Sequence, residues 1–234
     1  MHAVTAEDLK RKAAERAVTE VRAGMVLGLG TGSTVAHFLD LVGARIASGA
    51  LRDVVGIPTS VWTEERARAL GIGIVGFDRY ERVDLAVDGA DEVGPRLDLV
   101  KGMGGALLRE KMVAQAADRF LVIADGRKVV SRLGTVSALP VEVVPWGHEA
   151  PARHLRSLGA EVSLRHAEDG TPLRTDNGNL VLDCRFPDGI EDPVALERAI
   201  RRQAGVVETG LFLGMAHAAI IAREDGIELL DRNA

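Results

Sequence analysis

The chain has 234 residues, 47% of them hydrophobic and 27% charged, which is enough apolar material for one large core or two smaller ones. A net charge of -5 and an aromatic content of 3% argue against nucleic-acid binding, which needs a basic surface and stacking platforms. No apolar run approaches the roughly 20 residues of a spanning helix, so we expect no membrane insertion. The single cysteine and the lack of a signal-peptide pattern predict a cytoplasmic protein.

The first half of the chain alternates between helix-like and strand-like segments. Residues 5–23 are predicted as a helix, because Thr5 and Asp8 have capping-box spacing and Gly24 suits the end of a helix. The expected strands that follow are 25–29, 53–57, 72–75, 83–87, 97–100 and 120–124, and the expected helices are 35–41, 61–70 and 106–117. This alternation predicts a mostly parallel sheet covered by helices.

From about residue 135 the pattern becomes that of an antiparallel α+β unit. The expected strands are 139–144, 161–164, 173–185 and 206–212, and a helix is expected over 151–158. The turn signal Asp176-Asn177-Gly178 predicts a hairpin, and Asp192 and Pro193 predict the start of a second helix. The last segment, 216–230, contains an apolar run that could return to the first sheet.

The loop Gly28 to Thr34 lies between a predicted strand and a predicted helix, where free amides and the helix dipole favour an anion. A tight turn alone also explains such glycines. A nucleoside-triphosphate loop would need a lysine before its final hydroxyl residue, and Ser33 stands there instead. A dinucleotide loop would need a glycine in place of Ser33 and an acidic residue at the end of the next strand, whereas Asp53 stands at its start. A small phosphate ester is the anion that fits best.

Polar residues also follow three more of the predicted strands. Asp88-Gly89-Ala90-Asp91-Glu92 follows one strand, although solvated turn charges would explain this segment by itself. Lys101-Gly102-Met103-Gly104-Gly105 opens the helix that carries Glu110, a carboxylate with apolar helical neighbours that suits a base unless it is simply solvated. Lys128 follows strand 120–124. Because ligands of parallel sheets bind at the carboxyl edge, this convergence predicts a functional site.

Metal and thiol chemistry have little support in the sequence. The six histidines show no paired ligand spacing, so we expect no metal and no other cofactor. Cys184 lies in an apolar strand pattern, which favours a packed small residue over a nucleophile.

These segments together resemble the ribose-5-phosphate isomerase A family. The motifs that carry the resemblance are GLGTGST (28–34), IPTS (57–60), DGADEV (88–93), KGMGGALLREK (101–111), LPVEVVP (139–145), TDNGN (175–179) and VVETGLF (206–212). They occur in the family's order and cover nearly the whole chain. A single glycine loop would be weak evidence, but this ordered set is very specific.

The resemblance implies Glu110 as the catalytic base, with Asp88 and Lys101 as further catalytic residues. It implies that the sugar phosphate contacts Lys10, Thr31, Gly32, Ser33, Thr34, Asp88, Gly89, Ala90, Asp91, Lys101, Gly102, Met103, Gly104 and Lys128. Met103 replaces a glycine that the family usually has, and it would be strained if the position requires a positive φ.

The resemblance also implies an α/β fold in which a Rossmann-like, mostly parallel sheet domain (1–134 and 210–234) carries an inserted ferredoxin-like α+β domain (135–209). Homodimers or homotetramers are expected, with a small sugar phosphate as the only other partner. The expected chemistry is the interconversion of ribose 5-phosphate and ribulose 5-phosphate through an enediolate. The rival functions are an amino-sugar phosphate deaminase and a sugar-phosphate-sensing regulator, although the N-terminal helix leaves no room for a helix-turn-helix.

Overall fold

The computed structural model describes residues 4–232. Its contacts divide the chain into two compact units. Unit 1 comprises Met1–Ala90, Arg109–Lys128 and Met215–Ala234, and unit 2 comprises Asp91–Leu108 and Val129–Gly214. Residues 91–108, 129–134 and 210–214 therefore cluster with unit 2, whereas the domain boundaries expected from the sequence lie at 134 and 210.

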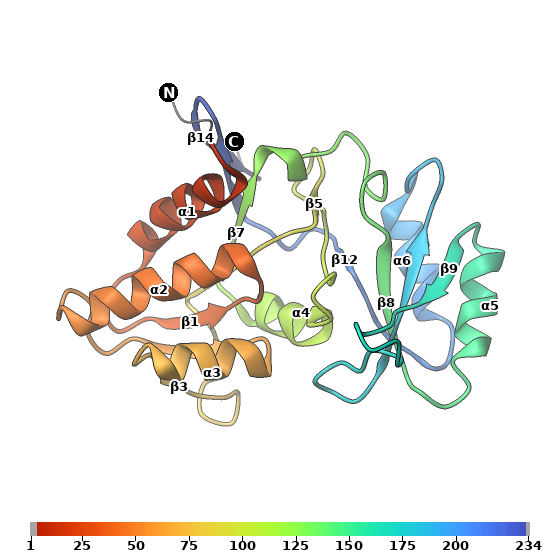
Figure 1. The fold of residues 1–234 in the computed structure, drawn as a ribbon, viewed down its shortest axis with the longest axis horizontal. Helices are drawn as coiled ribbons and strands as arrows, with labels where there is room; N and C mark the ends of the chain where they lie inside the picture. The colour runs from red at the N-terminus through yellow and green to blue at the C-terminus, as the bar shows by residue number, and fades with distance from the viewer. Residues whose placement is uncertain (1–3, 233–234) are drawn as a thin grey trace. The chain divides into compact units, whose positions relative to one another are not determined.

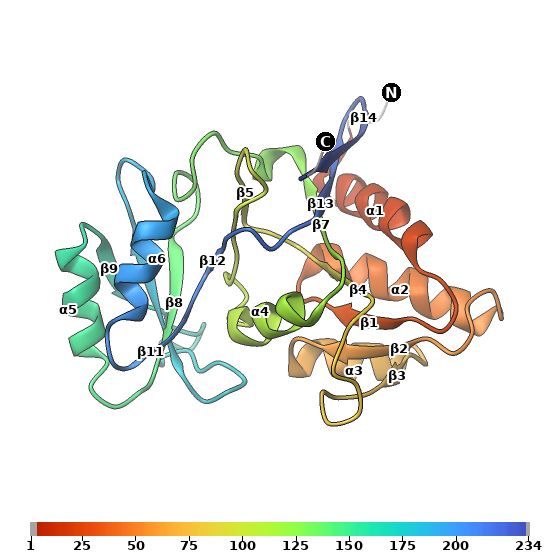
Figure 2. The same ribbon diagram turned by 180° about the vertical axis from the view of Figure 1, so that it is seen from behind.

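Unit 1 is built on a mostly parallel sheet (Figures 1 and 2). Its strands are β1 (Val26–Leu29), β2 (Val55–Pro58), β3 (Gly73–Ile74), β4 (Leu85–Asp88), β7 (Phe120–Asp125), β13 (Ala218–Arg223) and β14 (Gly226–Asp231). Within the described residues the order is β14-β13-β7-β4-β1-β2-β3, and only β14 is antiparallel to its neighbour. The C-terminal segment thus returns to the first sheet, and the predicted α/β class is confirmed.

Helices cover both faces of this sheet. They are α1 (Ala6–Ala17), the 3-10 turn η1 (Val18–Glu20), α2 (Ser33–Ala47), α3 (Val61–Ala69) and α4 (Leu107–Ala116). Leu27 and Leu29 point to the face covered by α1, α2 and α3, where they join one buried apolar cluster. Gly28 points to the other face, where an added Cβ would lie 2.5 Å from Cγ1 of Val113 on α4. The missing side chain therefore allows α4 to pack directly against β1.

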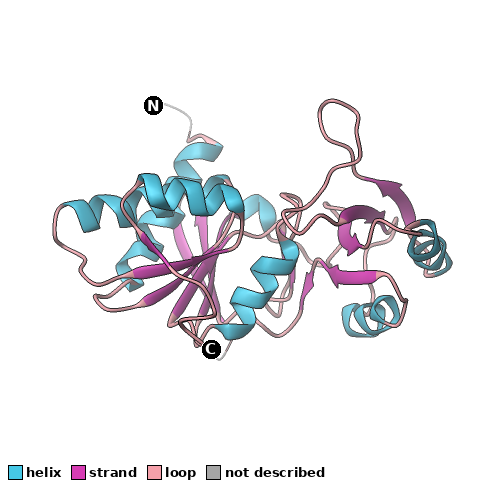
Figure 3. Ribbon diagram, turned by 90° about the horizontal axis from the view of Figure 1, so that it is seen from below, coloured by secondary structure: helices cyan, strands magenta, loops and turns pink. Residues whose placement is uncertain are grey.

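Unit 2 contains a four-stranded antiparallel sheet with two helices on one face (Figure 3). Its elements are β8 (Leu139–Val143), α5 (Glu149–Ser157), β9 (Glu161–Leu164), β10 (Leu180–Arg185), α6 (Pro193–Arg201) and β11 (Val206–Thr209). The order β11-β8-β10-β9 and the sequence βαββαβ are those of a ferredoxin-like fold. Alternate residues of β8, such as Val141 and Val143, pack under the helices, and Pro140 and Glu142 face the other way.

A second, smaller sheet of unit 2 was not expected from the sequence. It pairs β5 (Glu92–Val93), β6 (Leu99–Val100) and β12 (Leu211–Phe212), all antiparallel. The expected single strand over 206–212 is therefore two strands, which belong to different sheets and separate at Gly210. An added Cβ at Gly210 would lie 2.3 Å from the carbonyl oxygen of Lys101. Only glycine fits at this position, because any side chain would overlap that carbonyl group.

Local capping signals were reliable. Thr5 and Asp8 form the predicted capping box of α1, and the Asp192 side chain accepts from the amide of Ala195 ahead of Pro193. The predicted hairpin turn also forms, with Gly178 at φ 79°. Among residues 4–232, no helix is both long and apolar enough to span a bilayer.

Candidate active site

In unit 1, three neighbouring parallel strands carry predicted site residues at the same edge of the sheet. The order β7-β4-β1 places Lys128, Asp88 and the loop after β1 at adjacent carboxyl ends. Strand β1 pairs with β2, the next strand in the chain, on one side and with β4 on its other side. The strand order therefore reverses between β1 and β4, which flank a topological switch point. Ligands of open α/β sheets bind in the crevice at such a point.

Asp88 and Gly30 lie close together at this switch point. Asp88 is 3% exposed, and its Oδ1 accepts from the amides of Thr31 at 3.1 Å and Gly89 at 2.7 Å. An added Cβ at Gly30 would lie 2.3 Å from both Cγ and Oδ1 of Asp88. Gly30 is therefore required for the close approach of the two chain segments, and the loop and the carboxylate hold each other in place.

The Thr31 hydroxyl belongs to a cluster of hydroxyl groups from the IPTS segment and α3. Its Oγ1 lies 2.7 Å from that of Thr59, 2.8 Å from Oγ of Ser60 and 3.0 Å from Oγ1 of Thr63. Thr59 and Thr63 in turn donate to the carbonyl oxygens of Leu29 and Gly30. The single proton of Thr31 is thus used inside this cluster, which anchors the loop. The sequence had counted this hydroxyl among the donors for an anion.

The start of α2 keeps the features expected of an anion site. Gly32 is the N-cap at φ 118°, a conformation that favours glycine, and no side chain caps this end. Gly32 and Ser33 are exposed and Thr34 is half-buried. Since the first amides of a helix lack intrahelical acceptors, they and the two hydroxyls are the donors of this segment.

Glu110 is buried on α4, at 5% exposure. The alternative that it is an ordinary solvated residue between Arg109 and Lys111 is therefore wrong. The same helix packs against β1 through Val113, which fixes the depth of Glu110 in unit 1. A buried carboxylate on a rigid helix has the setting expected of a general base, and its catalytic role stays a prediction.

Lys128 ends η2 (Gly126–Lys128), which follows β7 directly. Its turn is fixed by Asp125, a buried residue that the sequence had not singled out. Asp125 accepts from the backbone amide of Arg127 at 3.0 Å and from the guanidinium at 2.7 and 2.9 Å. These bonds from Arg127, with a smaller contribution from the charge of Lys128, hold the pKa of Asp125 below its usual value. Lys128 is half-buried at the carboxyl edge of the sheet.

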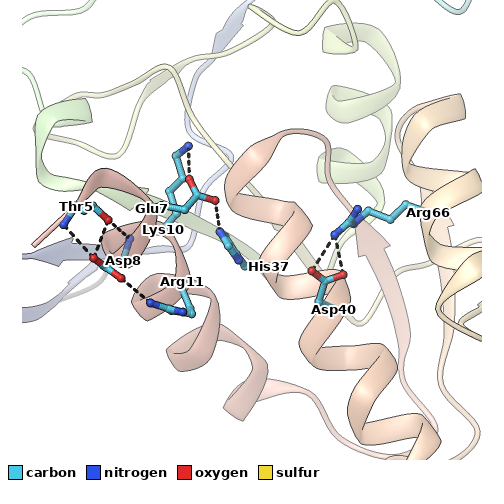
Figure 4. Close-up of polar contacts among 8 residues, drawn as sticks. All are labelled: Thr5, Glu7, Asp8, Lys10, Arg11, His37, Asp40 and Arg66. Carbon is cyan, nitrogen blue, oxygen red and sulfur yellow. Dashed lines mark hydrogen bonds and ion pairs between the residues drawn. The ribbon is translucent and has the colours of Figure 1, made fainter.

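Lys10 lies on α1 and is linked to α2 through two residues that the sequence analysis missed (Figure 4). Its Nζ lies 3.2 Å from Oε2 of Glu7, whose Oε1 lies 2.7 Å from Nε2 of His37. Hydrogen bonds from Lys10 and His37 lower the pKa of Glu7. His37 stands four residues after Ser33 on α2, so this bridge connects Lys10 to the helix that begins at the glycine loop.

In unit 2, Lys101 to Gly105 form a compact turn. Lys101 is 3% exposed, its amide donates to the Gly210 carbonyl at 2.9 Å, and its Nζ lies 5.4 Å from the ring centroid of Phe212. Gly102 and Gly105 have φ values of 106° and 78°, and the Gly105 amide donates to the Gly102 carbonyl. Met103 is 47% exposed and is not among the positive-φ residues, so the strain considered for this substitution does not arise.

Asp91 and Glu92 serve different purposes in unit 2. Asp91 accepts the amide of Met103 at 3.0 Å, which brings two predicted site segments together. Glu92 is fully buried and accepts from the amides of Gly134, Val136 and Ser137 at 2.6 to 2.7 Å. Glu92 therefore holds backbone and is not available to a ligand, a distinction that the acidic sequence alone could not make.

Over the part of the chain from 4 to 232, no group of three or more His, Cys, Asp or Glu side chains is arranged to hold a metal ion. Cys184 is fully buried, and burial raises the pKa of its thiol to about 12. That environment agrees with a packed residue and disfavours a nucleophile.

Unit 1 offers a helix start without a side-chain cap and a buried carboxylate, and unit 2 offers a lysine-glycine turn; these are features expected of a sugar-phosphate enzyme of the α/β class. The model of one protein family, ribose 5-phosphate isomerase A (phosphoriboisomerase A), matches residues 55–226. The chain belongs to this family.

Similar proteins cover the chain almost completely. The ribose-5-phosphate isomerase A of Roseiflexus castenholzii is 53% identical over 222 residues, which are 95% of this chain and 94% of that protein. A probable chloroplastic ribose-5-phosphate isomerase of Arabidopsis thaliana is 52% identical over 98% of this chain and 85% of its own length. A solved D-ribose-5-phosphate isomerase in complex with phospho-erythronic acid is 38% identical, with a TM-score of 0.95, and the match covers 97% of this chain and all of that one.

Proposed function

We propose that this protein interconverts D-ribose 5-phosphate and D-ribulose 5-phosphate, an aldose-ketose isomerisation of the non-oxidative pentose phosphate pathway. The family and the nearly full-length similarity to ribose-5-phosphate isomerases support this function. The observation that carries it within the structure is the burial of Glu110 on α4. The reaction needs one base that removes a proton from one carbon and returns it to the next, and a single fixed carboxylate can do both.

We assign the remaining roles from the environment of each residue. Lys101 stabilises the negative charge that develops on oxygen as the enediolate forms. Asp88, held by two amides, handles ring opening or hydroxyl proton transfer, and Asp91 orients hydroxyl groups near the glycine turn. Backbone amides hold Asp88 and Asp91, and the Lys101 ammonium lies over the Phe212 ring, so we expect little reorganisation during the reaction.

The phosphate is assigned to the start of α2 and to two lysines. The amides and hydroxyls of Ser33 and Thr34 donate to phosphate oxygens, and Lys128 and Lys10 supply positive charge. Thr31 supports this segment through its hydroxyl cluster instead of donating to the ligand. Binding energy from the phosphate then orients the reacting carbons.

Phospho-erythronic acid, the ligand of the solved relative, is also proposed to bind this chain. Its carboxylate carries two oxygens and a negative charge where the substrate forms an enediolate. It therefore probes the same site without reacting.

The test is the Glu110→Gln variant, assayed in excess chelator. Glutamine nearly preserves the size and polarity of glutamate but cannot accept and return a carbon-bound proton, so turnover should fall by at least about 1000-fold. Binding of phospho-erythronic acid and exchange of the transferring hydrogen with deuterated water are measured alongside. The matched control is Glu65→Gln, an exposed glutamate on α3.

The outcomes separate the possible functions. Binding without turnover or exchange in Glu110→Gln, with normal activity in the control, supports the proposal. Near-normal exchange would exclude Glu110 as the base. If the wild-type protein deaminates glucosamine 6-phosphate and leaves ribose 5-phosphate unchanged, the proposed isomerase function is wrong and the protein is an amino-sugar phosphate deaminase.

We further propose that the protein is a cytoplasmic homodimer or homotetramer. A cytoplasmic location is supported by its single, buried cysteine, although one relative is named chloroplastic. Light scattering coupled to size exclusion measures the assembly directly. A mass of one chain, 24.9 kDa, would contradict an oligomer.

A further inference from the structure

Arg165 binds the glycine turn of unit 2 on the face of the four-stranded sheet opposite the two helices. It follows β9, and its side chain is 10% exposed. Its Nη1 donates to the carbonyl oxygens of both Gly102 and Met103 at 2.9 Å. On its other edge, the guanidinium forms a two-bond ion pair with Asp183 of β10, with Nε 2.9 Å from Oδ2 and Nη2 bonded to Oδ1.

The opposite side of the turn is held by Asp91, which accepts the amide of Met103 at 3.0 Å. Since a trans peptide points its C=O and N–H in opposite directions, Arg165 and Asp91 fix the two ends of the same Gly102–Met103 peptide. The Met103 carbonyl also points to Arg165, so the N–H of the exposed Gly104 must point away from it. Asp91 already accepts the Met103 N–H, so the Gly104 N–H is the amide of this pair that is left to donate to a negative oxygen of a ligand.

Shape matters more than charge in this contact. Asp183 neutralises the guanidinium, so Arg165 supplies little net field to the turn. What it supplies is a planar fork whose separate N–H groups reach two carbonyls and one carboxylate at once. A lysine keeps the charge but cannot make this set of bonds. Neither Arg165 nor Asp183 belongs to the motifs of the sequence analysis, and they lie about 60 to 80 residues after the turn.

We propose that Arg165, oriented by Asp183, is a positioning residue that sets the glycine turn so that the Gly104 amide faces the reacting end of the sugar phosphate. The inference rests on the proposed function, because it places Lys101 and its turn at the oxygen that becomes negative. It predicts that Arg165 acts on the chemical step and not on phosphate binding.

The first experiment measures kcat and KM for ribose 5-phosphate in Arg165→Lys and Asp183→Asn. A turn that moves by a fraction of an ångström should lower kcat at least about tenfold, with KM changed less than about threefold. The matched control is Arg174→Lys. Arg174 lies on the same connection between β9 and β10, but its Nη1 donates to the carbonyl of Gly178 in the hairpin turn. Thermal unfolding of each variant shows whether it is folded.

The second experiment compares two ligands that differ only at the reacting end. Phospho-erythronic acid ends in a carboxylate, and erythritol 4-phosphate ends in a neutral hydroxymethyl group. The ratio of their affinities should fall at least about fivefold in Arg165→Lys, while the affinity for erythritol 4-phosphate stays nearly constant. A residue that only stabilised the fold would lower both affinities together.

The third experiment is chemical rescue of Arg165→Ala. Millimolar guanidinium, at constant ionic strength, should fill the vacated site and restore part of kcat, and it should not change Arg174→Ala. Wild-type kcat in folded Arg165→Lys and Asp183→Asn, or an unchanged ligand ratio, would overturn the proposal. If Arg165→Lys does not fold, Asp183→Asn and the rescue decide. An inactive wild-type protein would instead overturn the proposed isomerase function.

Discussion

Gly30→Ala adds one methyl group at the most crowded point of the switch between β1 and β4. The added Cβ would lie 2.3 Å from Cγ and Oδ1 of Asp88 and 2.7 Å from its Cα. Ordinary contact begins at 3.4 Å, so the two segments must separate by about 1 Å. Rotating the side chain of Asp88 cannot relieve the contact with Cα, which is backbone. Gly30 is not at positive φ, so steric overlap is the whole cause.

The expected result is a loss of both stability and turnover. Overpacking of this kind costs about 1 to 3 kcal/mol of unfolding free energy. A shift of about 1 Å between the loop and Asp88 would break the bond from the Thr31 amide and lower kcat by up to about 100-fold. The start of α2 lies beyond the clash, so we expect affinity for inorganic phosphate to fall less than kcat.

The assay combines isomerase kinetics, thermal unfolding and titration with inorganic phosphate. Gly73→Ala in β3 is the control, because it makes the same change in the same sheet with no atom closer than 3.4 Å to the added Cβ. If Gly30→Ala kept wild-type kcat and stability, the close approach of Gly30 and Asp88 would be wrong as described. If both variants lost activity equally, the effect would belong to glycine substitution in general.

Three other predictions test separate parts of the molecule. Lys128→Ala should raise KM about tenfold with kcat within about twofold in steady-state kinetics, since a phosphate contact kept throughout the reaction gives uniform binding, and an unchanged KM would remove Lys128 from the site. Glu142→Ala should lower the free energy of unfolding by about 2 to 4 kcal/mol in urea titrations, because Thr175, Asn177 and Asn179 all donate to its Oε1. Cys184 should resist a thiol reagent at pH 8 until the protein unfolds, because burial raises its pKa to about 12 and leaves almost no thiolate; rapid labelling of the native protein would contradict this.

The sequence predicted those elements best whose signals are local. The capping box at Thr5 and the Asp192-Pro193 helix start depend on residues within one turn, and both were found. The short strand β5 and the break at Gly210 depend on which segments lie nearby in space. A strand of two residues carries no periodic pattern, and a glycine that makes room for the Lys101 carbonyl looks like any other glycine. Such features follow only from the assembled fold.

A related reason explains why the sequence could not show how the candidate site residues are held. The sequence lists donors and acceptors, but it does not show which of them the protein itself already uses. Thr31 was counted as an anion donor, and its hydroxyl is bonded within the cluster of the IPTS segment. Glu92 was one of several acidic residues after a strand, and it accepts three backbone amides. Arg165 lies in no recognisable motif because its partners, Asp183 and the glycine turn, lie far from it in sequence.

The family motifs therefore contain two kinds of residue: those whose hydrogen bonds are made within the protein, and those whose donors are exposed to a ligand. Thr175 and Asn179 of the TDNGN motif donate to buried Glu142, so this motif secures the sheet of unit 2 and need not touch a ligand. Ser33, in contrast, is exposed at a helix start whose first amides have no acceptor within the helix. Both kinds of residue require fixed partners, and a motif search cannot tell a partner within the chain from one in the substrate. Substitution can, because loss of a structural bond lowers the stability of the free protein, and loss of a substrate bond leaves that stability unchanged.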